Sequence, residues 1–133
     1  DTEIFDNFLR DLFEWMEVEI GLHPVRTHQI NKSYESNLLV NSDKNILSPL
    51  DYLQRIQHNI QESLRNSNGM DVPFANFGLS FSADTASIPG LKPVPFRLER
   101  KLGLAFELNY YVSSAPIPTK DHLNILKTLE ELA

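Results

Sequence analysis

The sequence contains no cysteine, which excludes disulfide bonds, thiolate nucleophiles and cysteine-based zinc sites. This absence is compatible with a reducing cytoplasm. No run of about 18 apolar residues occurs, so no membrane span is expected. Glycine is scarce, with five in 133 residues, and none of them belongs to a phosphate-binding loop or a dinucleotide fingerprint. The five glycines are expected at turns, helix ends or strands.

The four histidines form no metal-binding pattern, because no two of them are at helical spacing. His23 and His28 are separated by a proline, which is poor geometry for a shared metal ion. No serine-centred nucleophile elbow is present. Asp84 could supply a carboxylate for acid–base chemistry, but loop acids of this kind usually cap a local turn. The sequence therefore predicts neither an enzyme nor a bound metal or cofactor.

What the chain does have is an uneven charge. The formal net charge is −6, and the imbalance lies in residues 1–24, which hold seven acidic residues against Arg10 alone. The rest of the chain is balanced, with eleven acids and eleven bases. Such a chain is not expected to grip nucleic acid, which requires a basic patch. A hydrophobic content of 41% predicts a globular domain rather than a disordered segment.

Residues 2–20 are predicted to form an amphipathic helix, because apolar side chains recur every three or four positions. These residues are Phe5, Phe8, Leu9, Leu12, Phe13, Met16 and Ile20. Thr2 is expected to cap the start of the helix, and Gly21 to end it. Two interpretations are open. Either the helix packs on the core with its acidic face in water, or the margin of its apolar face, near Trp15, docks a partner.

Two more helices are expected. One begins with Ser48 as its cap and ends at Asn68-Gly69, and its buried stripe consists of Leu50, Leu53, Ile56, Ile60 and Leu64. The other is a short tail helix capped by Thr119, which follows the stiff Pro-rich linker 115–118. Its apolar side carries Leu123, Leu126, Leu129 and Leu132. This side packs either on the core of its own chain or on a neighbouring subunit.

The strongest strand pattern covers residues 94–112, where the even positions are apolar except for Arg100. A break at Arg100-Lys101 indicates either a bulge or two strands that meet in a hairpin. Shorter strands are expected at 25–30, 37–40 and 77–81, with a turn at 31–33 between the first two. This order predicts an α+β domain over residues 1–114, with two main helices packed on one face of a small, largely antiparallel sheet. The Pro-rich linker and the C-terminal helical tail make up residues 115–133.

Two regions of opposite charge complete the pattern. The basic cluster Lys92, Arg97, Arg100 and Lys101 is either solvated surface or a partner for the acidic first helix of another copy. If the acidic and basic surfaces lie on different sides of the domain, copies can join head to tail, and a ring results when the contacts close.

Several local features occur in the order of one known family. A Gly-Leu-x-Pro-Val turn at Gly21–Val25 follows the first helix, and the strand at Phe77–Phe81 comes after the central helix. An apolar, Pro-containing loop at Ile88–Val94 leads to Glu99-Arg100 and the alternating residues Leu102–Tyr111. Over roughly residues 3–112, this layout resembles the tail terminator (tail-completion, or neck) proteins of long-tailed bacteriophages. The family usually has two strands before its central helix, whereas Lys32–Leu47 is short and polar here.

The resemblance implies a virion structural protein: a hexameric ring, assembled in the host cytoplasm, that caps the tail tube and docks to the head–tail connector. Such a ring encloses the DNA path without sequence-specific binding, and the family supplies no catalytic residue or cofactor. The candidate interface residues under this hypothesis are Glu14, Trp15, Glu17, Arg97, Arg100, Lys101, Tyr111, Leu123 and Leu126. Reversing the charge of Arg100 is expected to abolish assembly and to leave the fold intact.

The alternative hypothesis is a small acidic binding module, such as a secretion-type chaperone or an immunity protein. It would be a monomer or a two-fold dimer with an apolar groove for its partner. The symmetry of the charged surfaces separates the two hypotheses, since a two-fold contact pairs a patch with itself and gains nothing from opposite patches.

Overall fold

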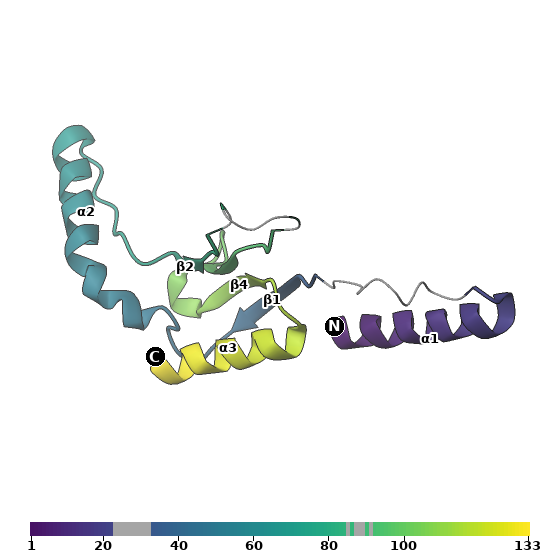
Figure 1. Cartoon of the computed structure of the whole chain (residues 1–133). Helices are drawn as coiled ribbons and strands as arrows, with labels where there is room; N and C mark the ends of the chain where they lie inside the picture. Colours follow the sequence, from purple (N-terminus) through teal and green to yellow (C-terminus); the bar gives the residue numbers. More distant parts are fainter. Residues whose placement is uncertain (23–32, 85, 87–89, 91) are drawn as a thin grey trace.

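A computed structural model describes residues 1–22, 33–84, 86, 90 and 92–133 (Figure 1). Within these residues the chain has an α+β fold with three α-helices and a four-stranded antiparallel sheet, as the sequence predicts. The elements are α1 (Thr2–Ile20), β1 (Ser36–Asn41), α2 (Gln54–Asn68), β2 (Gly78–Phe81), β3 (Phe96–Arg100), β4 (Tyr110–Ala115) and α3 (Thr119–Leu132). The strand expected at 25–30 lies outside the described residues, as does most of the turn at 31–33.

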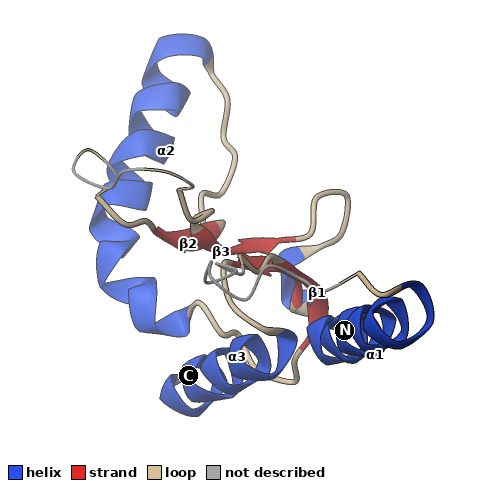
Figure 2. Ribbon diagram, turned by 45° about the vertical axis from the view of Figure 1, so that its right-hand side comes forward, coloured by secondary structure: helices blue, strands red, loops and turns tan. Residues whose placement is uncertain are grey.

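The sheet has the order β1-β4-β3-β2, with every neighbouring pair antiparallel. Ser113 of the central strand β4 pairs with Leu38 of β1 and with Leu98 of β3. Leu98 in turn pairs with Leu79 of β2. These four residues therefore share one face of the sheet. Helix α3 packs on that face, whereas α2 rises away from the sheet (Figure 2).

The core between α3 and the sheet is small. Its buried apolar residues are Ile46, Leu47, Phe96, Leu98, Tyr111, Ala115 and Leu126. The tail helix thus belongs to the same core as the strands, through Leu126 and the buried His122. Of the two alternatives that the sequence leaves open, the helix packs on the core of its own chain and not on a neighbouring subunit. The boundary between residues 114 and 115 stays a prediction.

The long alternating stretch is a hairpin and not one strand. Strand β3 ends at Arg100, and β4 begins only at Tyr110, after a connection that contains a short 3₁₀ turn at Phe106–Leu108. Phe96 and Leu98 are buried, as the even phase predicts. In β4, however, the odd positions Tyr111, Ser113 and Ala115 are buried. The expected strand at 102–108 is therefore wrong, and its apolar residues Leu102, Leu104, Phe106 and Leu108 are exposed.

The change of phase has a backbone cause. Asn109 adopts a left-handed conformation with a φ of 52°, and Gly103 does so with a φ of 82°. Residues in this conformation turn the chain out of the extended path, so the alternation of side chains restarts after each of them. Sequence periodicity alone does not detect such a restart.

Helix α1 has the predicted bounds, but it does not pack on the core as the first of the two interpretations expects. Asp1 caps it, accepting a hydrogen bond from the Glu3 amide at 2.9 Å, while Thr2 is the first helical residue. Gly21 ends it in a left-handed conformation, as predicted. No residue of α1 is buried, so a helix packed into the core is the wrong interpretation.

The second helix also departs from its expected packing. It starts as a 3₁₀ turn over Ser48–Leu53, with Leu47 at the cap position, and continues as α2 until Gly69 ends it. No residue of the predicted stripe is buried, and Ile56 and Ile60 are exposed. In Figure 1, α1 and α2 extend from opposite ends of the sheet, so neither can cover the apolar side of the other within one chain.

Candidate interaction surfaces

The predicted interface residues are divided between the surface and the interior. Glu14 and Trp15 are exposed on α1, and Glu17 is half-buried. Arg97 is exposed on the face of the sheet that α3 does not cover, and Leu123 is exposed on α3. Lys101 is half-buried at the end of β3. These six positions are wholly or partly exposed.

The other three predicted interface residues are internal. Arg100 is 6% exposed, Leu126 is 5% exposed, and Tyr111 is fully buried. A buried side chain offers no surface to another subunit, so the placement of these residues at an interface is corrected. In the folded chain they hold segments of the same molecule together.

Arg100 joins three segments of its own chain. Its Nε donates to the Asn76 carbonyl oxygen at 3.0 Å, and its Nη1 donates to the Phe106 carbonyl oxygen at 2.7 Å. The guanidinium also lies 4.8 Å from the ring centre of Phe106 and 5.4 Å from that of Tyr111, within range of cation–π attraction. The planar fork of the guanidinium explains why an arginine occupies this buried position.

Asn45 is the acceptor that completes this cluster. Its Oδ1 accepts from Arg100 Nη2 at 2.7 Å, from the Leu47 amide at 3.2 Å and from the Tyr111 hydroxyl at 3.2 Å. Sequence reasoning missed Asn45, which lies in a polar loop with no pattern around it. Only the partners that approach it from distant strands mark it out.

A second buried cluster surrounds His122. Its Nε2 is 2.8 Å from Ser113 Oγ, and its Nδ1 is 3.0 Å from Ser36 Oγ. Ser113 Oγ itself donates to the Arg97 carbonyl oxygen at 2.8 Å, which uses its single proton. Ser113 must then accept from His122 Nε2–H, and Nδ1 accepts from Ser36. We therefore assign the neutral Nε2–H tautomer to His122.

The serine–histidine contact is structural in this position. Ser113 and His122 are both fully buried. Burial lowers the pKa of His122 below its ordinary value of 6.5, which favours the neutral ring. The edge of the ring lies against Phe96, at 5.8 Å between ring centres. Together these contacts attach α3 to β1, β3 and β4.

One uncovered apolar surface lies on α1. Ile4, Phe8, Trp15 and Val18 lie along one side of the helix and are 70%, 58%, 53% and 78% exposed. We call these four residues the α1 stripe. The neighbouring side of α1, with Phe5, Leu9 and Phe13, lines a groove of about 840 Å³ against residues 33–38.

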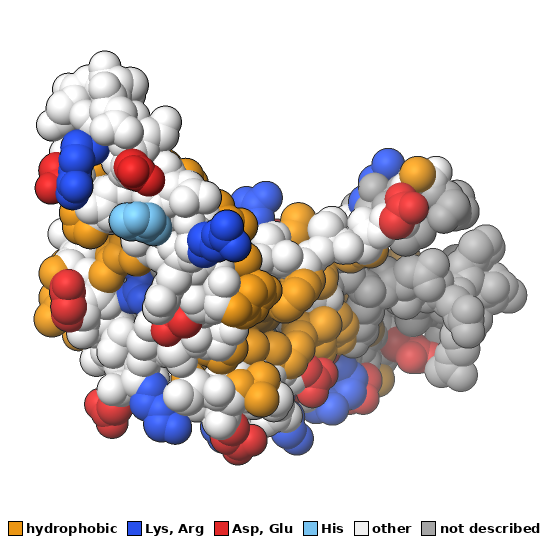
Figure 3. Space-filling view, turned by 90° about the vertical axis from the view of Figure 1, so that its left-hand side faces the viewer, with side chains coloured by type: hydrophobic (Ala, Val, Ile, Leu, Met, Phe, Trp, Pro, Cys, Tyr) orange, Lys and Arg blue, Asp and Glu red, His pale blue; other side chains and the backbone are white. Residues whose placement is uncertain are grey.

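A second uncovered apolar surface lies at the other end of the sheet. Ile56 and Ile60 of α2 line a groove of about 430 Å³ together with Phe74 and Phe77. The Phe77 ring lies 6.4 Å from that of Phe106, in the β3–β4 connection that also carries Leu104. We call Ile56, Ile60, Phe74, Phe77, Leu104 and Phe106 the α2 surface. Figure 3 faces this end and shows hydrophobic side chains gathered in its middle, with charged side chains at the border.

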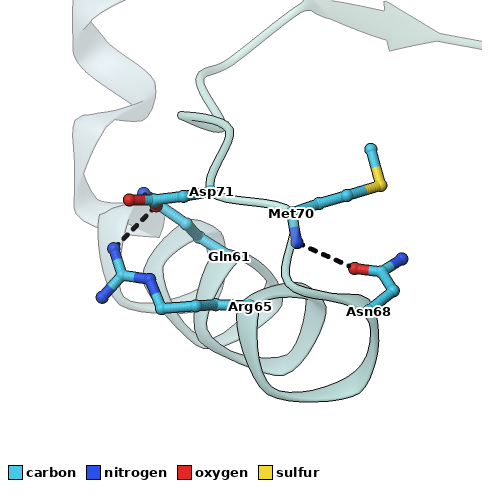
Figure 4. A network of polar contacts seen from close by, with 5 residues as sticks. All are labelled: Gln61, Arg65, Asn68, Met70 and Asp71. Carbon is cyan, nitrogen blue, oxygen red and sulfur yellow. Dashed lines mark hydrogen bonds and ion pairs between the residues drawn. The ribbon is translucent and has the colours of Figure 1, made fainter.

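The chain returns from α2 through a polar network (Figure 4). Arg65 Nη2 and Gln61 Nε2 both donate to Asp71 Oδ1, at 2.6 Å and 3.0 Å, and the Met70 amide donates to Asn68 Oδ1 at 3.1 Å. The hydrogen bond from Arg65, and then that from Gln61, lower the pKa of Asp71. This network orients the segment that forms the far wall of the α2 groove.

In the described part of the chain, no group of three or more histidine, cysteine, aspartate or glutamate side chains is arranged to hold a metal ion. None of its helices combines the length and the apolar character needed to cross a bilayer. No family model, curated protein or solved structure matches this chain.

Proposed function

We propose that this chain is a self-assembling structural subunit. In the specific form suggested by the resemblance to tail terminators, its ring caps a phage tail tube and docks to the head–tail connector within the virion. The single observation that supports self-assembly is the exposure of α1, whose 19 residues include several large apolar side chains and not one that is buried.

The free energy of hydration gives this observation its weight. Burying apolar surface is favourable by about 25 cal/mol per Å². Monomeric proteins rarely expose continuous apolar patches larger than a few hundred Å², and larger ones usually mark interaction sites. Since none of its residues is fully buried, α1 gains little from packing within its own chain, and a partner that covers its apolar side would stabilise it.

Fewer charged residues support the proposal than the sequence predicts. Arg97 and Lys101 remain accessible for an acidic partner surface, and Glu14 and Trp15 lie together on α1. Arg100, which belonged to the same predicted patch, is internal. Charge pairing is therefore expected to guide the orientation of the subunits, while apolar burial supplies most of the affinity.

The mass of the full chain in solution tests the proposal. We expect light scattering to give a mass of several subunits, and negative-stain images of the same sample to show rings. Measurements at low and high salt separate the two contributions, because a contact driven by apolar burial persists at high salt. A chain that remains monomeric in both salts, alone and with isolated tail tubes, contradicts the proposal.

One observation favours the second candidate, a small acidic binding module. The groove of about 840 Å³ beside α1 combines apolar residues with five acidic residues, Asp1, Asp6, Glu14, Glu17 and Glu35, and one basic residue, Arg10. Such a lining suits a basic amphipathic segment of another protein. A salt-insensitive monomer or two-fold dimer that binds such a peptide would favour this candidate over the ring.

A further inference from the structure

We infer that the α1 stripe of one copy docks on the α2 surface of a second copy, in a head-to-tail contact. This inference rests on the proposed self-assembly and deepens it by naming the two surfaces that meet. It commits to a second copy of this chain as the occupant of the α2 groove.

The α1 stripe has the spacing of a helix-packing seam. Positions 4, 8, 11, 15 and 18 alternate steps of four and three residues, so they lie in one row along the helix. Four of these positions are Ile4, Phe8, Trp15 and Val18, and the middle position is Asp11. The row therefore offers two apolar pairs separated by one carboxylate.

Asp11 argues against pairing of the stripe with itself. Because it lies midway between the ends of the row, an antiparallel two-fold pair would place Asp11 against Asp11 of the other copy. A parallel pair would do the same. Arg10 donates to Asp11 at 3.4 Å, but both side chains are exposed, and such a pair compensates little of the charge. Docking on a different surface of the second copy removes the pairing of Asp11 with Asp11. The α2 groove has one carboxylate in its lining, Glu99, among mostly apolar and neutral polar residues.

The α2 surface is that different surface, and it lies at the opposite end of the strands. Thr2 of α1 and Thr119 of α3 exchange hydrogen bonds, since each backbone N–H donates to the hydroxyl of the other residue, at 3.2 Å and 2.9 Å. This junction lies just beyond Ala115, which pairs with Ser36 at one end of the sheet. Phe77 and the β3–β4 connection lie at the other end, where Asn41 pairs with Tyr110.

Six-residue strands separate the two ends by about 20 Å. Figure 1 shows α1 and α2 leaving the sheet in different directions. A stripe at one end and a receiving surface at the other form a heterologous pair. Repetition of such a contact gives a closed ring or an open filament, depending on the rotation between neighbouring copies.

The available area agrees with a stable contact. A helix of 19 residues is about 28 Å long. Aromatic residues bury 150–250 Å² each, and the four stripe residues together expose on the order of 500 Å². A specific interface buries roughly 800 Å² per partner. The stripe and its flanking residues come close to this value, and the α2 groove has an apolar floor for its larger side chains.

A mixing experiment tests the contact directly. Phe8→Asp disables the stripe and leaves the α2 surface intact, whereas Ile56→Asp does the reverse. Both native side chains are more than half exposed, so circular dichroism is expected to show a retained fold. We expect each variant alone to be monomeric by light scattering, and an equimolar mixture to form a 1:1 dimer that does not grow. Leu39→Asp, at an exposed site on β1 outside both surfaces, is the matched control and is expected to assemble like the wild type.

The outcomes are distinguishable. If Phe8→Asp or Ile56→Asp alone still assembles, or if the mixture stays monomeric while the wild type assembles, the inference is wrong and self-assembly stands. A wild type that stays monomeric both alone and with isolated tail tubes contradicts the proposed function itself and removes the basis of the inference.

The absence of cysteine allows an independent second test. Copies carrying Trp15→Cys are mixed with copies carrying Leu104→Cys and treated with a short bis-maleimide. Crosslinks between the two kinds of copy support the contact. Crosslinks confined to pairs of Trp15→Cys copies would indicate two-fold pairing of α1 and overturn it.

Discussion

Arg100 and Asn45 are 55 positions apart in the chain, and yet Arg100 Nη2 donates to Asn45 Oδ1 at 2.7 Å. This hydrogen bond ties the end of β3 to the loop that leads from β1 toward α2. The same oxygen accepts from Leu47 and Tyr111, so one amide side chain organises three separate segments. Arg100, which the sequence pattern places at an interface, is therefore an internal residue.

Asn45→Ala is expected to destabilise the fold by roughly 1–3 kcal/mol, because Arg100 Nη2 and the Leu47 amide lose their acceptor, whereas the Tyr111 hydroxyl keeps Asn109 Oδ1. Urea denaturation followed by circular dichroism measures the loss. Asn37→Ala removes an asparagine that is exposed on β1 and serves as the control, with an expected change within about 0.5 kcal/mol. Equal effects of the two substitutions would contradict the role of Asn45.

Arg100→Glu is expected to unfold the chain or to lower its melting temperature sharply, because it places a carboxylate against the carbonyl oxygens of Asn76 and Phe106. This expectation replaces the one drawn from sequence, in which the fold survives and only assembly is lost. Arg97→Glu reverses an exposed charge on the same strand and should leave the melting temperature nearly unchanged. A folded, monomeric Arg100→Glu variant would restore the interface assignment.

Acidic pH is expected to destabilise the attachment of α3 to the sheet, because His122 becomes protonated. Because its pKa is lowered in the folded state, the unfolded chain takes up a proton first as the pH falls below about 6.5. The stability contributed by the neutral ring is therefore complete above that pH, and it is lost as the pH falls toward the lowered folded-state pKa. Urea denaturation at a series of pH values between neutral and mildly acidic conditions measures this slope.

The variant His122→Gln should flatten that part of the pH profile, and it should lose about 1–3 kcal/mol at neutral pH because the ring no longer bridges Ser36 and Ser113. His58→Gln changes an exposed histidine of α2 and should keep the slope of the wild type. A slope that disappears in His58→Gln instead would refute the assignment to His122.

Gly78→Ala is expected to destabilise the β2–β3 pairing. A Cβ atom at this position would lie 2.5 Å from the Leu98 carbonyl oxygen and 2.9 Å from Glu99 Cγ. The backbone cannot yield without opening the pairing of Gly78 with Glu99, so a loss of about 1–3 kcal/mol is expected. Thermal unfolding compares the melting temperature of Gly78→Ala with that of Ser82→Ala, which changes an exposed residue just beyond β2. An unchanged melting temperature of Gly78→Ala would contradict the close approach of β2 and β3 at this position.

Local patterns were sufficient for some of the structure. Apolar residues at helical spacing and the glycines at 21 and 69 predicted where α1 begins and where α1 and α2 end, because helix boundaries depend on neighbouring residues and on the left-handed conformation that glycine adopts easily. The antiparallel α+β class likewise followed from the order of periodic segments. Of the candidate interface residues, Glu14, Trp15 and Arg97 are exposed, and their place at an interface stays a prediction.

What lies inside the molecule was decided only by the tertiary structure. The phase of β4 reverses because Gly103 and Asn109 redirect the backbone, while the apolar alternation of the sequence continues across both residues. Arg100 and His122 are buried because distant residues, such as Asn45 for the first and Ser36 for the second, meet their polar atoms. The folded chain leaves the side of α1 that bears Ile4 and Phe8 uncovered, and the amphipathicity of the helix does not specify which surface covers it. That choice depends on what the folded chain leaves uncovered at the far end of its sheet.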